Sequence, residues 1–240
     1  MEKIYTIPVN EAFDACAADH TCGCPFCRLE NKLEENELEL ILGASMMEPD
    51  VRIRTNALGF CGSHYTMMLG RQKRLPLALI LQSHLDEVRT DTESGGFTAL
   101  FKGAGTGVTE KLEKREKSCY ICERVGGSLA KMFENAAWLW ENDPAFREKT
   151  TAQPYFCLPH MRMWLESGQR EIGKKNYAAF YKAVSAVVNA YFDSLREDIG
   201  WFVKKFDYRY DAEPWGNAKD ACERAVRFLS GDRHRQPSKQ

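Results

Sequence analysis

A pattern of cysteine and histidine residues occurs twice in the chain and constrains its fold more than any other feature. Each copy reads Cys-x2-Cys, a long gap, then Cys-x2-His. The copies comprise Cys24, Cys27, Cys61 and His64, and then Cys119, Cys122, Cys157 and His160. A two-residue spacer lets both side chains of a pair reach one ion, and four such ligands form a closed tetrahedral zinc site. The sequence therefore predicts two Zn²⁺ per chain, one for each consecutive copy.

The two copies also match outside the ligands. Pro49 follows Cys27 by 22 positions, and Pro144 follows Cys122 by the same interval. From these cysteines to the third cysteine of each copy the interval is 34 positions in the first copy and 35 in the second. The copies begin 95 positions apart, further than common repeat units extend. We interpret the pattern as a duplicated helical half-domain.

Hydrophobic periodicity predicts an all-α protein, in which two duplicated helical half-domains pack on a long C-terminal helix. That helix is expected over 174–206, where apolar and aromatic residues recur every three or four positions. The lead over 1–23 reads as irregular or partly strand-like. The predicted organisation is 1–93 for the lead and first zinc-binding repeat, 94–118 for a glycine-rich linker and charged lead, and 119–240 for the second repeat with the long and C-terminal helices.

Two further interpretations concern single faces of predicted helices. The glutamates of the helix over 28–47 are expected to form a solvated face, because the second copy lacks carboxylates at most matching positions. In the last helix, over 217–229, Cys222 shares a stripe with small and apolar residues and is expected to be buried.

Composition limits the classes of partner. The formal net charge is −1, so no overall basic field favours nucleic acid. The N-terminal residues lack the apolar region of a signal peptide, and no apolar stretch is long enough to span a membrane. Six of the nine cysteines fall in the metal patterns, which fits a reducing compartment. We expect a cytoplasmic protein with a protein partner, without membrane association and without nucleic acid as a favoured partner.

Three more candidate ligands, Cys16, His20 and Cys22, come just before the first pattern. One interpretation makes them ordinary side chains of a loop over the site. The other is a thiol switch, in which Cys22 competes with Cys24 for the metal or oxidises with a neighbouring thiol.

The chain shows no set of residues typical of catalysis. A helix with His84 carries only part of a zinc-hydrolase pattern, and the glycines of 103–107 lack the lysine of a phosphate loop. We therefore expect a zinc-binding helical scaffold or interaction protein rather than an enzyme, because a closed site activates no water. The alternative is a redox protein that uses the first cysteine-rich site as a thiol switch, or that holds an iron–sulfur cluster.

The cysteine motifs and several other stretches resemble a known family. The residues that carry the resemblance are 5–13, 22–27, 48–52, 59–64, 119–122, 156–160 and 205–210. They are similar to functionally uncharacterised bacterial proteins, mostly from Firmicutes, grouped as a domain of unknown function. The resemblance implies a cytoplasmic protein with these Cys/His sets, and it implies no reaction or substrate.

Overall fold

The computed structural model describes residues 5–93 and 106–232, and across these ranges the regular structure is helical, without strands. The prediction of an all-α protein is confirmed. The glycine-rich part of the predicted linker, 94–105, lies outside the described residues. Within the described ranges, no helix combines the length and the apolar character that a membrane span requires.

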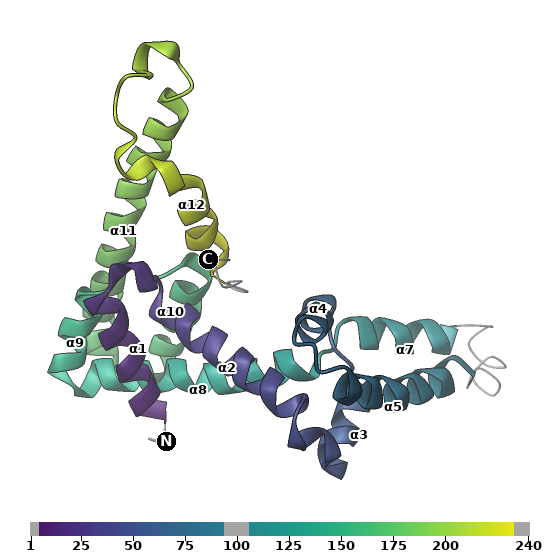
Figure 1. Ribbon diagram of the computed structural model, residues 1–240. Helices are drawn as coiled ribbons and strands as arrows, with labels where there is room; N and C mark the ends of the chain where they lie inside the picture. The colour runs from purple at the N-terminus through teal and green to yellow at the C-terminus, as the bar shows by residue number, and fades with distance from the viewer. Residues whose placement is uncertain (1–4, 94–105, 233–240) are drawn as a thin grey trace. The chain divides into compact units, whose positions relative to one another are not determined.

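The chain forms two compact units that differ from the predicted boundaries. One comprises Met1–Lys32 together with Leu129–Gln240, and the other comprises Leu33–Ser128. Two long helices, α2 (Pro25–Ile41) and α8 (Tyr120–Asn142), each contribute residues to both units. The chain therefore leaves the first unit along α2 and returns to it along α8, so the units are not consecutive halves of the sequence (Figure 1).

The first unit contains α1, α9, α10, α11 and α12 with short 3₁₀ turns (Figure 1). Its elements are α1 (Thr6–Ala18), η2 (His20–Cys22), α9 (Pro144–Thr151), α10 (Leu158–Glu171), α11 (Lys174–Lys204), η4 (Tyr208–Tyr210), η5 (Gly216–Asp220) and α12 (Ala221–Ser230). The long helix α11 packs against α9, α10, α12 and η5. Its observed end lies close to the predicted one.

Helix α1 corrects the expectation of an irregular or strand-like lead. Val9, Ala12, Phe13 and Cys16 are spaced as one face of a helix, and all four are buried. Pro8 is compatible with this helix because it lies in the first turn, where backbone N–H groups have no partner within the helix.

An aromatic cluster fills the core of this unit. Phe13, Phe26, Phe156 and Trp164 are fully buried, and the Phe13 ring centroid lies 5.4 Å from that of Phe26 and 5.7 Å from that of Trp164. Both contacts are edge-on, an arrangement that aromatic rings favour. The cluster joins α1, α2 and α10, and thus fixes the elements that carry the first cysteine pair and the last histidine.

The C-terminal helix differs from its predicted packing. Ala221 and Phe228 form its buried face, whereas Cys222 is exposed. The expectation that Cys222 is buried is wrong because α12 uses a different stripe of residues from the one the small side chains indicated.

The second unit is built around the end of α2 and the start of α8. It also contains η3 (Ala44–Met47), α3 (Pro49–Leu58), α4 (Gly62–Gly70), α5 (Arg74–Glu93) and α7 (Thr106–Glu116). Leu38, Ile41, Met68 and Ile80 belong to its buried core. Helix α7 is held by Arg115, whose Nε donates to Asp91 Oδ2 at 2.6 Å and whose Nη1 donates to the Asn56 carbonyl at 2.8 Å.

Candidate metal centres

The first group of ligands joins the start of α2 to the start of α10. Sulfur atoms of Cys24, Cys27 and Cys157 and a ring nitrogen of His160 all lie within 4.8 Å of one another, and all four residues are buried. Cys24 immediately precedes α2, and Cys27 is in its first turn. Cys157 is the N-cap residue of α10, and His160 is in its first turn.

The second group joins the starts of α4 and α8. Cys61, His64, Cys119 and Cys122 also place their ligand atoms within 4.8 Å of one another. Cys61 is the N-cap residue of α4, and Cys119 immediately precedes α8. This group is more accessible than the first, since Cys122 is exposed and Cys61 is half-buried.

All eight predicted ligands are therefore brought together, but not in the predicted sets. The assignment of Cys24 and Cys27 to a site with Cys61 and His64 is wrong, as is that of Cys119 and Cys122 with Cys157 and His160. Each Cys-x2-Cys pair is completed by the Cys-x2-His of the other copy.

The lengths of two helices explain the exchange of partners. Helix α2 has 17 residues and α8 has 23. At a rise of about 1.5 Å per residue, the chain moves roughly 25 Å along α2 before it reaches Cys61. The first cysteine pair therefore stays in one unit while Cys61 and His64 lie in the other.

The distances within the groups fit one tetrahedral ion in each. With metal–sulfur bonds of about 2.3 Å, a tetrahedron places two sulfurs about 3.8 Å apart. The Cys27 and Cys157 sulfurs are 3.6 Å apart, and those of Cys61 and Cys122 are 3.9 Å apart. Both groups consist of three soft sulfur donors and one imidazole nitrogen, a donor set suited to a soft or borderline metal ion.

Both histidines present Nδ1 to the sulfurs. His64 Nδ1 lies 3.1 Å from Cys61 Sγ and 3.2 Å from Cys119 Sγ. His160 Nδ1 lies 3.2 Å from Cys157 Sγ and 3.4 Å from Cys27 Sγ. The ligating nitrogen is therefore Nδ1 in each group, which leaves Nε2 for a second partner.

That second partner is a carboxylate on α2 in both cases. His64 Nε2 lies 2.9 Å from Glu34 Oε1, and His160 Nε2 lies 3.1 Å from Glu30 Oε2. The two glutamate side chains are only 13% and 14% exposed. Each carboxylate orients its imidazole and raises the basicity of the ligating nitrogen, as carboxylates behind metal-bound histidines do.

These contacts correct the reading of the α2 glutamates as a solvated face. Glu30 and Glu34 point at the histidines, while Glu35 pairs with Arg71. Nothing in the cysteine pattern marks the two residues, because the histidines that they contact lie 130 and 30 positions further along the chain. Their spacing of four residues is equally typical of an exposed helix face.

Charge within the groups favours a cation at the centre. Burial opposes protonation of His64, but its hydrogen bonds with Cys119 and Glu34 outweigh this and raise its pKa to about 10. For His160 the same balance of burial against Cys157, Cys24 and Glu30 raises the pKa to about 12. Burial works against ionisation of Cys119, yet its contact with His64 lowers the thiol pKa to about 6. Each group therefore has one thiol with a lowered pKa, Cys24 or Cys119, beside a protonated imidazole, and a metal ion would displace the imidazole proton together with the protons of the other thiols.

Backbone groups add to this preference for a charged centre. A tetrad of three thiolates and one neutral imidazole around a divalent ion has a net charge of −1. All four ligand pairs lie at helix N-termini, where the helix dipole stabilises negative charge. In the first group the Asp232 backbone N–H also donates to Cys27 Sγ at 3.3 Å.

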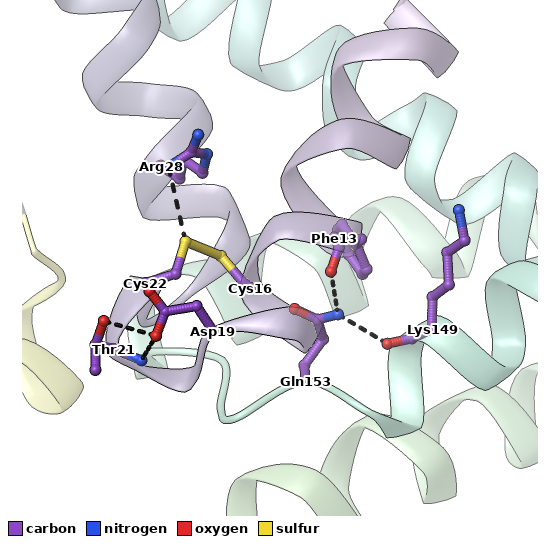
Figure 2. The surroundings of a disulfide bond; sticks show 8 residues. All are labelled: Phe13, Cys16, Asp19, Thr21, Cys22, Arg28, Lys149 and Gln153. Atoms are coloured by element: carbon purple, nitrogen blue, oxygen red, sulfur yellow. Dashed lines mark hydrogen bonds between the residues drawn. A yellow bond between two sulfur atoms is a disulfide. The ribbon is translucent and has the colours of Figure 1, made fainter.

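The additional candidates before Cys24 are not part of either group. Cys16 and Cys22 form a disulfide bond across α1 and η2, and the Arg28 guanidinium lies 3.9 Å from Cys22 Sγ (Figure 2). His20 is exposed on the intervening turn. Of the alternatives for Cys22, the structure has the thiol oxidised with a neighbour and not competing with Cys24 for the ligand group.

Comparison with known proteins places the chain in one family. No curated protein and no solved structure matches it. A family match covers residues 1–236, which includes both ligand groups and the disulfide. The chain therefore belongs to the family of unknown function DUF6062.

Proposed function

We propose that this protein is a zinc-stapled helical scaffold that acts by binding a protein partner in the cytoplasm. The observation that carries the proposal is the pair of Cys₃His groups, each with a largely buried carboxylate next to its histidine. Zinc accepts this mixture of thiolate and imidazole in tetrahedral geometry.

A structural role follows from the number of ligands. Four protein ligands complete the coordination of Zn²⁺ and leave no position for a water or a substrate. Binding free energies of structural zinc are about 10–16 kcal/mol, comparable to the stability of a whole domain. Each ion would join two helix starts that are far apart in sequence, so its main effect would be to stabilise the folded state. We propose no enzymatic activity.

Metal analysis with an absorbance spectrum on anaerobically purified protein tests the proposal. We expect two zinc ions per chain and no absorption in the visible range. Cys222→Ser serves as the matched control, since this exposed cysteine belongs to neither group. A visible spectrum with iron would replace the proposal by an iron–sulfur protein, and one ion per chain would contradict it.

The disulfide between Cys16 and Cys22 favours a second candidate, a thiol switch beside the first metal group. Oxidation by a peroxide would convert the two thiols into the disulfide and reduce the peroxide to water or an alcohol. A cellular dithiol would return the two electrons and two protons and itself become a disulfide. Only Gly23 separates Cys22 from Cys24, so forming or breaking this disulfide changes the chain next to a metal ligand.

Chelator competition on the reduced and oxidised protein distinguishes the two functions. A switch requires zinc to leave the first group at different rates in the two redox states, and requires Cys22→Ser to abolish the difference. Equal rates of zinc loss in the two redox states would exclude the switch and leave the scaffold as the proposed function.

A further inference from the structure

The ligands of the first group are closed off from solvent. Its four residues are each at most 3% exposed: Cys24, Cys27, Cys157 and His160. The end of the described chain covers one of the sulfurs, because the Asp232 backbone N–H donates to Cys27 Sγ at 3.3 Å. Asn31 Nδ2 holds this segment in place by donating to the Asp232 carbonyl at 2.9 Å. A ligand from solution therefore reaches these sulfurs only after a local opening of the structure.

The second group has one buried edge and one open edge. His64 and Cys119 form the buried edge and are only 3% and 7% exposed. Cys61 and Cys122 form the open edge, where Cys61 is half-buried and Cys122 is exposed. The sulfurs of this open edge lie 3.9 Å apart. A ligand from solution can approach an ion in this group from the open edge while the buried edge still holds the ion.

The position of Cys122 in its helix does not explain its exposure. Cys27 and Cys122 are equivalent in the two copies, since each is the second cysteine of its pair and lies in the first turn of a long helix. Cys27 is nevertheless buried beneath the segment that follows α12, whereas Cys122 is exposed. The reactivity of a thiolate depends on its access to solvent. The two groups therefore combine the same donor atoms with different access.

We propose that the second group is an exchangeable metal site, which releases and accepts its ion by substitution with small thiols, whereas the first group retains its ion. This inference rests on the zinc-bound scaffold proposed above. An incoming thiol binds the ion at the open edge and takes the coordination position of Cys122 Sγ. The bond between Cys122 and the ion breaks, and the proton of the incoming thiol ends on Cys122, so that atoms and charge balance. Cys61 follows in the same way, and the reverse reaction loads the site.

The rate of metal release from the full-length, metal-loaded protein tests the exchange. A chromophoric chelator in excess reports free zinc while reduced glutathione is added at rising concentrations. We expect one ion per chain to be lost in a fast phase whose rate rises with the thiol concentration. The other ion should leave in a slow phase that does not depend on the thiol. Cys22→Ser should give the same two phases, which separates the exchange from reduction of the disulfide between Cys16 and Cys22.

Alkylation with N-ethylmaleimide, followed by peptide mapping, identifies the group that loses the first ion. Cys61 and Cys122 should be labelled as that ion leaves, while Cys27 stays protected. Cys222 is the internal standard, because this exposed cysteine belongs to neither group and reports the labelling rate of a free thiol.

The outcomes separate this inference from the scaffold on which it rests. A chain that binds fewer than two zinc ions would contradict both. Two ions that leave at the same rate would overturn the exchange and leave the scaffold intact. The same holds for a fast phase that does not respond to the thiol, and for labelling that reaches Cys27 before Cys122.

Discussion

The carboxylate of Glu30 lies 3.1 Å from Nε2 of His160, on the side of the imidazole that faces away from the sulfur ligands. Glu34 holds the same position behind His64. Carboxylates of this type typically contribute 10–100-fold to metal affinity.

Replacement of either glutamate by glutamine should therefore lower the affinity for one metal ion about 10–100-fold and leave the affinity for the other unchanged. Glu30→Gln acts on the group with His160, and Glu34→Gln acts on the group with His64. Competition with a chromophoric chelator measures both affinities, and Glu39→Gln, on an exposed position of the same helix, is the control. Unchanged affinities in both variants would show that the carboxylates do not support the ligands.

The exchanged pairing of the cysteine motifs gives a prediction that a pair of double variants decides. Cys24→Ser with Cys157→Ser removes two ligands of one group, so one metal ion per chain should remain. Cys24→Ser with Cys61→Ser damages both groups, so neither ion should be held stably. Elemental analysis counts the ions. Pairing within consecutive copies would give the reverse result, with one ion retained in the second variant.

Cys22→Ser should leave the metal content unchanged, because Cys22 belongs to neither ligand group. Its effect is confined to the oxidised protein. Closing the short loop from Cys16 to Cys22 stabilises the folded state by about 2 kcal/mol in the loop-entropy estimate. Denaturant unfolding should therefore show that reduction destabilises the wild type and not the variant. Loss of zinc from Cys22→Ser would instead give this sulfur a role in the first metal group.

Two glycines in helices should respond to alanine with opposite signs. A Cβ on Gly168 would lie 2.4 Å from Phe180 Cε1, so Gly168→Ala should destabilise the fold by about 1–3 kcal/mol. A Cβ on Gly200 meets nothing within 4 Å, so Gly200→Ala should stabilise α11 by about 1 kcal/mol. Thermal unfolding measures both. Stabilisation by Gly168→Ala would mean that Phe180 can move away from α10.

The identity of the ligands could be read from the sequence, whereas their pairing could not. Each Cys-x2-Cys pair is a local motif at the start of a helix, so the residues themselves define it. Which Cys-x2-His pair completes each group depends on the path of the chain along α2 and α8. The intervals of 34 and 35 positions are compatible with either choice. Equal spacing in two copies indicated consecutive sites, and the continuity of two long helices overrode it.

Other differences have equally local causes. The helical class followed from periodicity, and the long helix α11 was predicted nearly to its ends. Helix α1 was missed because its buried face has few residues, and Pro8 reads as a helix breaker outside a first turn. Glu30 and Glu34 gain their role only from histidines distant in sequence, which no single-helix pattern contains.

The ligand groups are nested along the chain like an inner and an outer pair of brackets. The inner group closes between Cys61 and Cys122, while the outer one spans Cys24 to His160. A polypeptide emerges from the ribosome N-terminus first. Cys24 and Cys27 are therefore the first metal-binding thiols to be synthesised, but their ligand group is the last to have all four of its ligands. The inner ion can be bound as soon as Cys122 has emerged, and the order of metal acquisition is then opposite to the order in which the two cysteine pairs are made.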